Sequence, residues 1–165
     1  MRYQRVSISL FLVIVLACIA PAQQPGQKVP TVEVAPVGKV QVRTGATAKV
    51  EIDFRIPSEF HINSNKPHSE LLIPTTLRLN VTDPIKIGSV TYPAGQDMSF
   101  PFAPTDKLSV YSGDFTITTV IKALPTATNG TYPVNGELHF QACDRSACYP
   151  PKSIPVKFEI TVLNR

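Results

Sequence analysis

The sequence predicts an all-β protein built as one antiparallel β-sandwich. Apolar and polar residues alternate with a period of two in several stretches, which buries one face of a strand and leaves the other in water. Turn-forming residues separate these stretches at fairly regular spacing. The 165 residues include 16 prolines, which oppose long helices, and no segment carries a helical stripe. Many short strands with regular turns are typical of an immunoglobulin-like sandwich.

The first residues have the character of an export signal. Arg2 and Arg5 give a basic start, residues 6–19 are apolar apart from two serines, and small alanines suited to cleavage follow. The apolar run is shorter than the roughly 20 residues of a membrane span. We therefore expect a signal peptide at 1–22 and an exported protein.

Cys18 permits a second interpretation of this signal. Residues 15–18 resemble the lipobox of bacterial lipoproteins, although Leu16 fits that pattern poorly. Either Cys18 is discarded within the signal, or the signal ends at 17 and Cys18 is lipidated, which would tether the protein to the membrane. In both cases the folded domain keeps one cysteine pair, in an oxidising compartment where disulfides persist.

Residues 23–36 are rich in Pro, Gln and Val and predict a flexible leader. The β-sandwich domain is expected over 37–165. Its first clear strand covers 48–56, where Val50, Ile52 and Phe54 alternate with charged residues. The same alternation, at every second position, recurs in residues 77–81, 115–121, 136–142 and 154–162.

The charge pattern excludes some function classes. Without Arg2 and Arg5 the chain has 14 basic and 12 acidic residues, scattered singly, so no nucleic-acid surface is predicted. His61, His68 and His139 are spread along the sequence, and two thiols without a nearby histidine are a weak zinc signal. We therefore expect no metal site.

The pair Cys143 and Cys148 carries most of the functional information. Four residues separate the two, so a turn at the end of a strand would bring them within disulfide distance. So short a loop stabilises the fold by only about 2 kcal/mol. Arg145 would stabilise a thiolate and Asp144 would oppose it. From these residues alone, a reversible redox pair and a permanent structural disulfide both remain open.

The cysteine segment resembles a known family. Phe-Gln-Ala-Cys at 140–143 and Cys-Tyr-Pro-Pro at 148–151, with Tyr-Pro-Ala-Gly at 92–95 and Val-Tyr-Ser-Gly at 110–113 upstream, resemble the amino-terminal periplasmic domain of the DsbD thiol:disulfide interchange protein. The resemblance covers roughly Val37 to Val162. It implies an immunoglobulin-like domain in the periplasm whose cysteine pair shuttles electrons without a cofactor.

The resemblance also implies roles and partners. Cys148 would form the mixed disulfide and Cys143 would resolve it. The partners would be a thioredoxin-like protein or domain and a periplasmic disulfide isomerase or other oxidised client, which would make the protein a candidate protein-disulfide reductase. Family members shield the disulfide with an aromatic cap loop, here represented by Phe100 or Phe102; alternatively, both are ordinary core or loop aromatics. Apart from the resemblance, His139 shares the polar face of its strand with Gln141, where it would either tune the nearby thiols or be an ordinary solvated histidine.

Two differences from the family pattern bear on these expectations. Some members have five residues between the cysteines, and this chain has four. Full-length DsbD also carries a multi-span membrane domain and a thioredoxin-like domain, and this sequence contains neither, so its electrons would come from a separate protein. The alternative function is a non-enzymatic β-sandwich adaptor that binds a protein through a strand edge or loop and keeps its disulfide closed.

Overall fold

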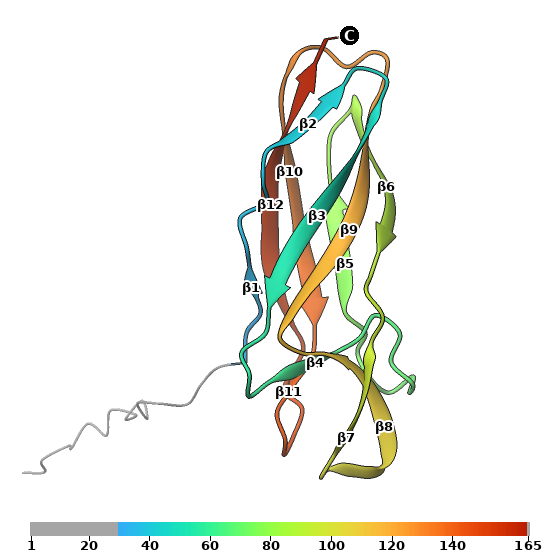
Figure 1. The fold of residues 1–165 in the computed structure, drawn as a ribbon, viewed down its shortest axis with the longest axis vertical. Coiled ribbons are helices and arrows are strands. Elements are labelled where there is room, and N and C mark those ends of the chain that lie inside the picture. The colour runs from blue at the N-terminus through green and yellow to red at the C-terminus, as the bar shows by residue number, and fades with distance from the viewer. Residues whose placement is uncertain (1–29, 165) are drawn as a thin grey trace, which may run out of the picture.

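The computed structural model describes residues 30–164, and within this range it contains strands and turns but no helix (Figure 1). It follows that no helix of the described range has the length and apolar character of a membrane span. Two long sheets face each other, and a smaller third sheet lies at the lower end of the molecule in Figure 1. The predicted all-β sandwich is confirmed.

The first long sheet is antiparallel throughout and has the order β1-β3-β9-β6. Its strands are β1 (Glu33–Val34), β3 (Thr47–Arg55), β9 (Asp114–Ala123) and β6 (Ile85–Thr91). The central pair β3–β9 runs in unbroken register from Thr47↔Lys122 to Arg55↔Asp114.

The second long sheet has the order β2-β12-β10-β5. Its strands are β2 (Val40–Arg43), β12 (Lys152–Leu163), β10 (Gly130–Phe140) and β5 (Thr76–Asn80). In contrast to the antiparallel pairing expected throughout, β2 runs parallel to β12. A tight turn follows β2, where Gly45 has a φ of 80°, and the chain then continues into β3 of the first sheet.

The core fills the space between the two long sheets. The predicted alternation is confirmed in β3, where Val50, Ile52 and Phe54 are buried and the residues between them are exposed. Phe54 stacks on Phe115 of β9, with ring centroids 5.1 Å apart. Burying side chains of this size stabilises the fold by roughly 1.5–3 kcal/mol each.

The third sheet has the order β11-β4-β8-β7 and was not predicted as a unit. Its strands are β11 (Ala142–Cys143), β4 (His61–Asn63), β8 (Ala103–Tyr111) and β7 (Gln96–Phe100). Tyr111 at the end of β8 stacks on Phe115 at 5.0 Å, which joins this sheet to the sandwich core. The sheet extends the sandwich at the end that carries the cysteines.

Part of the expected leader belongs to the folded structure. Glu33 and Val34 form β1 and pair with β3, and Val32 is buried in the core. The Lys152 ammonium donates a hydrogen bond to the Pro30 carbonyl, 3.3 Å away. The apolar Val residues of this stretch complete the edge of the first sheet, which the Pro-rich composition did not indicate. The export signal, its alanines and Cys18 lie outside the described residues.

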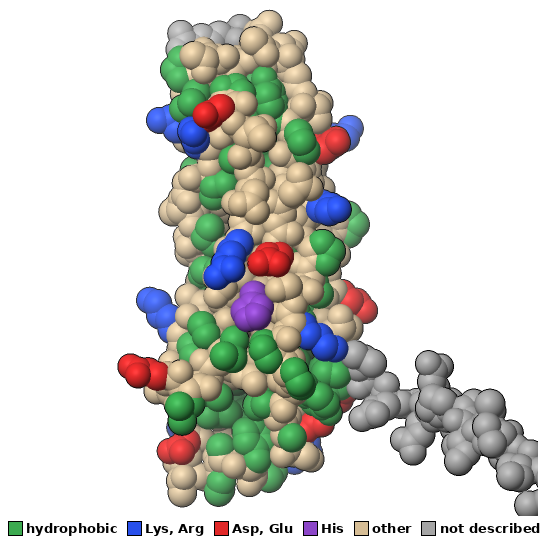
Figure 2. Space-filling model, turned by 180° about the vertical axis from the view of Figure 1, so that it is seen from behind, with side chains coloured by type: hydrophobic (Ala, Val, Ile, Leu, Met, Phe, Trp, Pro, Cys, Tyr) green, Lys and Arg blue, Asp and Glu red, His purple; other side chains and the backbone are tan. Residues whose placement is uncertain are grey.

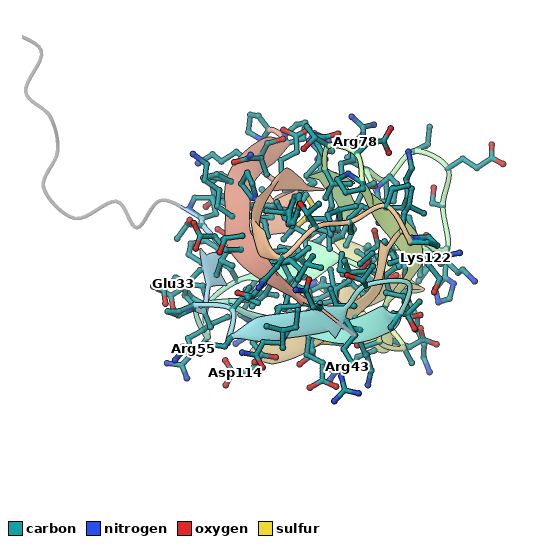
Figure 3. The ribbon with its side chains drawn as sticks, turned by 90° about the horizontal axis from the view of Figure 1, so that it is seen from above. Glu33, Arg43, Arg55, Arg78, Asp114 and Lys122 are labelled. Atoms are coloured by element: carbon teal, nitrogen blue, oxygen red, sulfur yellow. A yellow bond between two sulfur atoms is a disulfide. The ribbon has the colours of Figure 1, made fainter. Side chains whose placement is uncertain are left out.

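Charged side chains lie around the outside of the sandwich. Viewed along the long axis, the labelled side chains Arg55, Asp114 and Glu33 lie at the periphery on one side, and Arg78 and Lys122 lie elsewhere on the rim (Figure 3). Arg55 donates to the Asp114 carboxylate at 2.9 Å, which holds the pKa of Asp114 below its usual value. Both groups are solvent-exposed, so screening leaves the pair little influence on stability.

Candidate functional site

The expected disulfide joins Cys143 and Cys148, with an S–S distance of 2.06 Å. The two residues are paired across a short antiparallel bridge. Backbone hydrogen bonds flank the pair: Tyr149 N–H donates to Ala142 C=O at 2.8 Å, and Asp144 N–H donates to Ala147 C=O at 2.9 Å. The cysteines thus form a non-hydrogen-bonded pair, the type in which Cα atoms approach most closely, and their Cα atoms are 3.9 Å apart.

The position of the pair follows from the strands around it. The β10–β12 ladder ends at Phe140↔Lys152, and the cysteine loop continues from that end. Cys143 pairs with His61 of β4, which places the disulfide in the third sheet. In Figure 1 this loop and the β7–β8 hairpin occupy the same end of the molecule.

The two sulfur-bearing residues differ in exposure. Cys143 is fully buried at 0% relative exposure, whereas Cys148 is partly exposed. Thiol–disulfide exchange begins with attack of an incoming thiolate on a sulfur that it can reach. The geometry therefore allows attack on Cys148 with Cys143 as the leaving sulfur, and disfavours the reverse.

Asp144 organises the turn between the cysteines. Its Oδ1 accepts hydrogen bonds from the Ser146 and Ala147 N–H groups at 2.6 and 2.9 Å, and its Oδ2 accepts from the Tyr149 hydroxyl at 2.6 Å. These bonds, that from Tyr149 first, lower the pKa of Asp144, while the same carboxylate raises the pKa of Tyr149. Asp144 thus has a structural role that the sequence did not predict. Arg145 is exposed on the turn, and the tuning of thiols by either residue stays a prediction.

Gln141, the first residue of the Gln-x-Cys motif, ties three segments together. Its Oε1 accepts a hydrogen bond from Asn63 Nδ2 at 3.1 Å, and its Nε2 donates to the Tyr149 carbonyl at 3.2 Å. Asn63 Nδ2 also donates to the Ile73 carbonyl at 3.0 Å. The glutamine therefore holds the residue after Cys148 against β4 and the loop that follows β4.

The residues of the two upstream motifs make contacts both within the sandwich and around the third sheet. The Tyr92 hydroxyl accepts a hydrogen bond from Leu77 N–H of β5 at 2.7 Å. The Tyr111 hydroxyl donates to Asn65 Oδ1 at 2.6 Å, and burial raises the pKa of Tyr111. Gly95 is in close contact with Ser64 and Ser109, and an added Cβ would overlap both side chains. These motif residues position the site and do not themselves reach the cysteines.

The predicted cap residues lie at the tip of the β7–β8 hairpin. Phe100 is buried in a small cluster with Leu108 and Val110, while Phe102 is partly exposed. The two rings stack at 5.5 Å, and Phe100 also stacks on the His61 ring at 3.9 Å. His61 is paired with Cys143, so this histidine connects the hairpin tip to the strand pair that carries the disulfide. The action of either ring as a lid stays a prediction.

His61 is the site residue that the sequence did not indicate. It is only 4% exposed, and its Nε2 has no hydrogen-bond partner among residues 30–164. Burial lowers the pKa of His61 to about 4, against a smaller opposing effect of Asp144. No sequence signal distinguished it from the other two histidines, because its neighbours in the site come from distant parts of the chain.

The other histidines lie elsewhere. His139 forms a hydrogen bond with Ser153 Oγ at 3.2 Å on the β10–β12 ladder, and its tuning of the thiols stays a prediction. His68 contacts Asp97 at 2.7 Å on the exposed side of β7. Between residues 30 and 164, no three His, Cys, Asp or Glu side chains are grouped as a metal site.

Apolar side chains are exposed at the cysteine end. Figure 2 shows hydrophobic groups gathered over the lower end of the molecule, with charged groups more separated along the rest of that face. Leu71, Met98 and Phe102 are among the large apolar side chains exposed in the described part of the chain, at 91%, 37% and 37%. Met98 and Phe102 belong to the hairpin that carries the predicted cap. Exposed apolar surface of this kind is typical of a protein–protein contact site.

Comparison with known proteins identifies related sequences and folds. The family described as thiol:disulfide interchange protein DsbD, N-terminal, matches residues 28–159. No curated protein sequence matches the chain.

Solved structures that are similar to this chain have low sequence identity. The seventh ScaB type I cohesin from Pseudobacteroides cellulosolvens has 17% identity and a TM-score of 0.50, over 81% of this chain and 93% of the cohesin. The N-terminal periplasmic domain of ScsB from Proteus mirabilis has 12% identity and a TM-score of 0.52, over 82% of this chain and 48% of that one. The DsbD N-terminal domain from Neisseria meningitidis, solved in complex with the PilB N-terminal domain, has 19% identity and a TM-score of 0.43, over 76% of this chain and 80% of that one.

Proposed function

The chain belongs to the family of the N-terminal domain of the thiol:disulfide interchange protein DsbD, and from this premise we propose that it is an exported thiol–disulfide exchange domain. Cys143 and Cys148 form its reversible redox pair. It relays electrons between a thioredoxin-like protein and an oxidised client protein of the cell envelope. The reaction needs no cofactor, because the sulfur atoms themselves accept and donate the electrons.

The observation that carries this proposal is the unequal exposure of the two cysteines. Cys148 is partly exposed, and Cys143 is fully buried. A partner thiolate reaches the Cys148 sulfur, forms a mixed disulfide there and releases Cys143. A structural disulfide does not require an accessible sulfur. A redox pair requires one sulfur that a protein partner can reach and a second that resolves the mixed disulfide.

The apolar end of the molecule supports a protein partner rather than a small thiol. Met98 and Phe102 expose apolar surface on the hairpin that carries the predicted cap. A partner that covers this surface would exclude water from the exchanging sulfurs and displace the hairpin tip. The tip then restricts access to the disulfide when no partner is bound.

The reduction potential tests the proposal against a permanent disulfide. The purified oxidised protein is equilibrated with glutathione or dithiothreitol buffers, and the fraction of free thiol is measured. A potential between about −270 and −120 mV, the range of known exchangers, supports the relay. A potential below about −300 mV indicates a structural bond and favours the alternative, an adaptor that binds a protein through a strand edge or loop.

Trapping variants test the roles of the two cysteines. Cys143→Ser leaves Cys148 free, and this thiol is first converted to its disulfide with thionitrobenzoate. A thioredoxin-like protein whose own resolving cysteine is removed should then attack Cys148, release thionitrobenzoate and remain as a stable mixed disulfide. Cys148→Ser is the matched control and should form little, because its remaining sulfur is buried. Equal trapping by both variants would contradict the assigned roles, and trapping by neither would contradict the relay.

A further inference from the structure

His61 presents an unsatisfied polar atom next to the buried half of the disulfide. The residue is 4% exposed, and Nε2 is a buried nitrogen without a hydrogen-bond partner in the described part of the chain. Leaving such an atom unpaired costs roughly 1–3 kcal/mol, so native proteins rarely retain one without a reason. Asn63 Oδ1 and Thr119 Oγ1 are also buried without a partner within residues 30–164, but Asn63 is paired with Val110, and Thr119 with Val50 and Val90, whereas His61 is paired with a cysteine.

The register of β4 and β11 identifies what faces His61. His61 lies directly opposite Cys143, and Ile62 lies opposite Ala142. Residues directly opposite each other on antiparallel strands project to the same face, with Cβ atoms about 4.5–5.5 Å apart. Phe100 stacks on the imidazole at 3.9 Å with an interplanar angle of 13°, which fixes the plane of the ring. The imidazole is therefore held beside the sulfur that the proposed reaction releases.

We propose that His61 is a positioning residue for Cys143: when the disulfide opens, the Nε2 nitrogen forms a hydrogen bond with the Cys143 sulfur and stabilises the reduced state. This inference rests on the proposed function only in assuming that the disulfide opens. In the oxidised protein the sulfur carries neither a proton nor a charge, so the imidazole has little to bind. Reduction supplies the missing partner.

Reduction of the Cys143–Cys148 disulfide by a partner dithiol takes place in two exchange steps. A partner thiolate attacks Cys148, an S–S bond forms between partner and Cys148, the Cys143–Cys148 bond breaks, and its electron pair leaves on Cys143. The second thiol of the partner then displaces Cys148. Two electrons pass from the partner dithiol to the cysteine pair, and the two protons of the partner thiols end on the two cysteine sulfurs.

Burial keeps the His61 imidazole neutral, so one ring nitrogen carries a proton and the other can accept one. Burial lowers the pKa of His61 to about 4, so the ring is neutral near neutral pH and carries one N–H. Asp144 is the acidic group that opposes this shift, and its oxygens already accept from Ser146, Ala147 and Tyr149. A neutral imidazole that places its proton on Nε2 donates to a thiolate, and in the other tautomer it accepts from a thiol.

The thiol–disulfide equilibrium with glutathione tests this role without any protein partner. His61→Phe keeps an aromatic ring against Phe100 and removes both nitrogens. Loss of one hydrogen bond in the reduced state should make the disulfide harder to reduce, lowering the equilibrium constant for reduction about fivefold. His61→Gln, which keeps a donor and an acceptor, should recover part of this change. His68→Gln, which changes an exposed histidine paired with Asp97, is the matched control and should leave the equilibrium unchanged.

A second measurement uses the wild-type protein, so it does not depend on how well a variant folds. With ¹⁵N-labelled histidine, the His61 Nε2 resonance should move when glutathione reduces the protein at neutral pH, while both nitrogens of the exposed His68 keep their resonances. An unchanged equilibrium constant in His61→Phe, or a His61 Nε2 resonance that does not move, overturns the inference. Both measurements use a small thiol, so the inference can hold even if no thioredoxin-like protein reacts with the domain.

Discussion

Acidification is expected to destabilise the oxidised protein through His61. The pKa of this buried histidine is about 4 in the folded protein, against an ordinary value of 6.5 that applies to the unfolded chain. Between these two values the unfolded chain binds the proton and the folded protein does not. The free energy of unfolding therefore falls as the pH is lowered from 6.5 to 4, and the full difference corresponds to about 3 kcal/mol.

Two neighbouring effects fall outside this pH window. The pKa of Asp144 is held below its ordinary 3.8, first by the Tyr149 hydrogen bond, so its stabilisation is lost only as the pH falls below that value. The exposed carboxylate of Asp114 follows the same sign in the same acidic range. The loss above pH 4 is therefore assigned mainly to His61.

Urea unfolding from pH 6.5 down to pH 4 measures this effect. His61→Phe keeps a ring against Phe100 and cannot titrate, so its stability should vary much less over this interval than that of the wild type. His139→Gln should keep the wild-type pH dependence, because the buried histidine remains. Parallel curves for the wild type and His61→Phe would refute the reasoning.

Three further predictions concern residues other than His61. Gly136→Ala should lower the free energy of unfolding, measured in urea, by about 1–3 kcal/mol, because an added Cβ overlaps the Arg78 carbonyl. Gly38→Ala places its Cβ in open space and should leave the free energy of unfolding unchanged. Equal unfolding midpoints for the two variants would contradict this prediction. Gln141→Leu should cost about 1–3 kcal/mol in the same assay by removing the hydrogen bonds that hold the segment after Cys148, and a wild-type midpoint would argue against that role. Replacing Phe100 and Phe102 together with alanine should speed the oxidation of the reduced dithiol by peroxide, and an unchanged rate would count against a cap.

The sandwich was predictable where strands bury one face only. In β3, β9 and β12 the buried and exposed residues alternate along most of the strand, as the sequence pattern required. The three residues of β4 are all buried, and the first four residues of β7 are all exposed. Neither strand alternates between buried and exposed residues, so the sequence there had no period of two that would predict a strand. The parallel partnership of β2 with β12 depends on contacts between distant segments and has no local signature.

The same reason explains which parts of the site were predictable. The disulfide was expected because its two cysteines and their turn are adjacent in the sequence. His61 was not, because its relation to Cys143 depends on the pairing of β4 with β11, about 80 residues apart in the chain. The structural role of Asp144 depends on its contacts with Tyr149 and the turn backbone, which composition does not specify.

The long β10–β12 ladder has a consequence for how the cysteines behave once separated. Eleven residue pairs hold the two strands in register up to Phe140↔Lys152, independently of any bond between the sulfur atoms. The opened thiols therefore remain tethered at a high effective concentration, and ring closure is intramolecular. A covalent adduct on Cys148 should accordingly be short-lived while Cys143 is present, so that turnover is rapid and wild-type protein captures few intermediates.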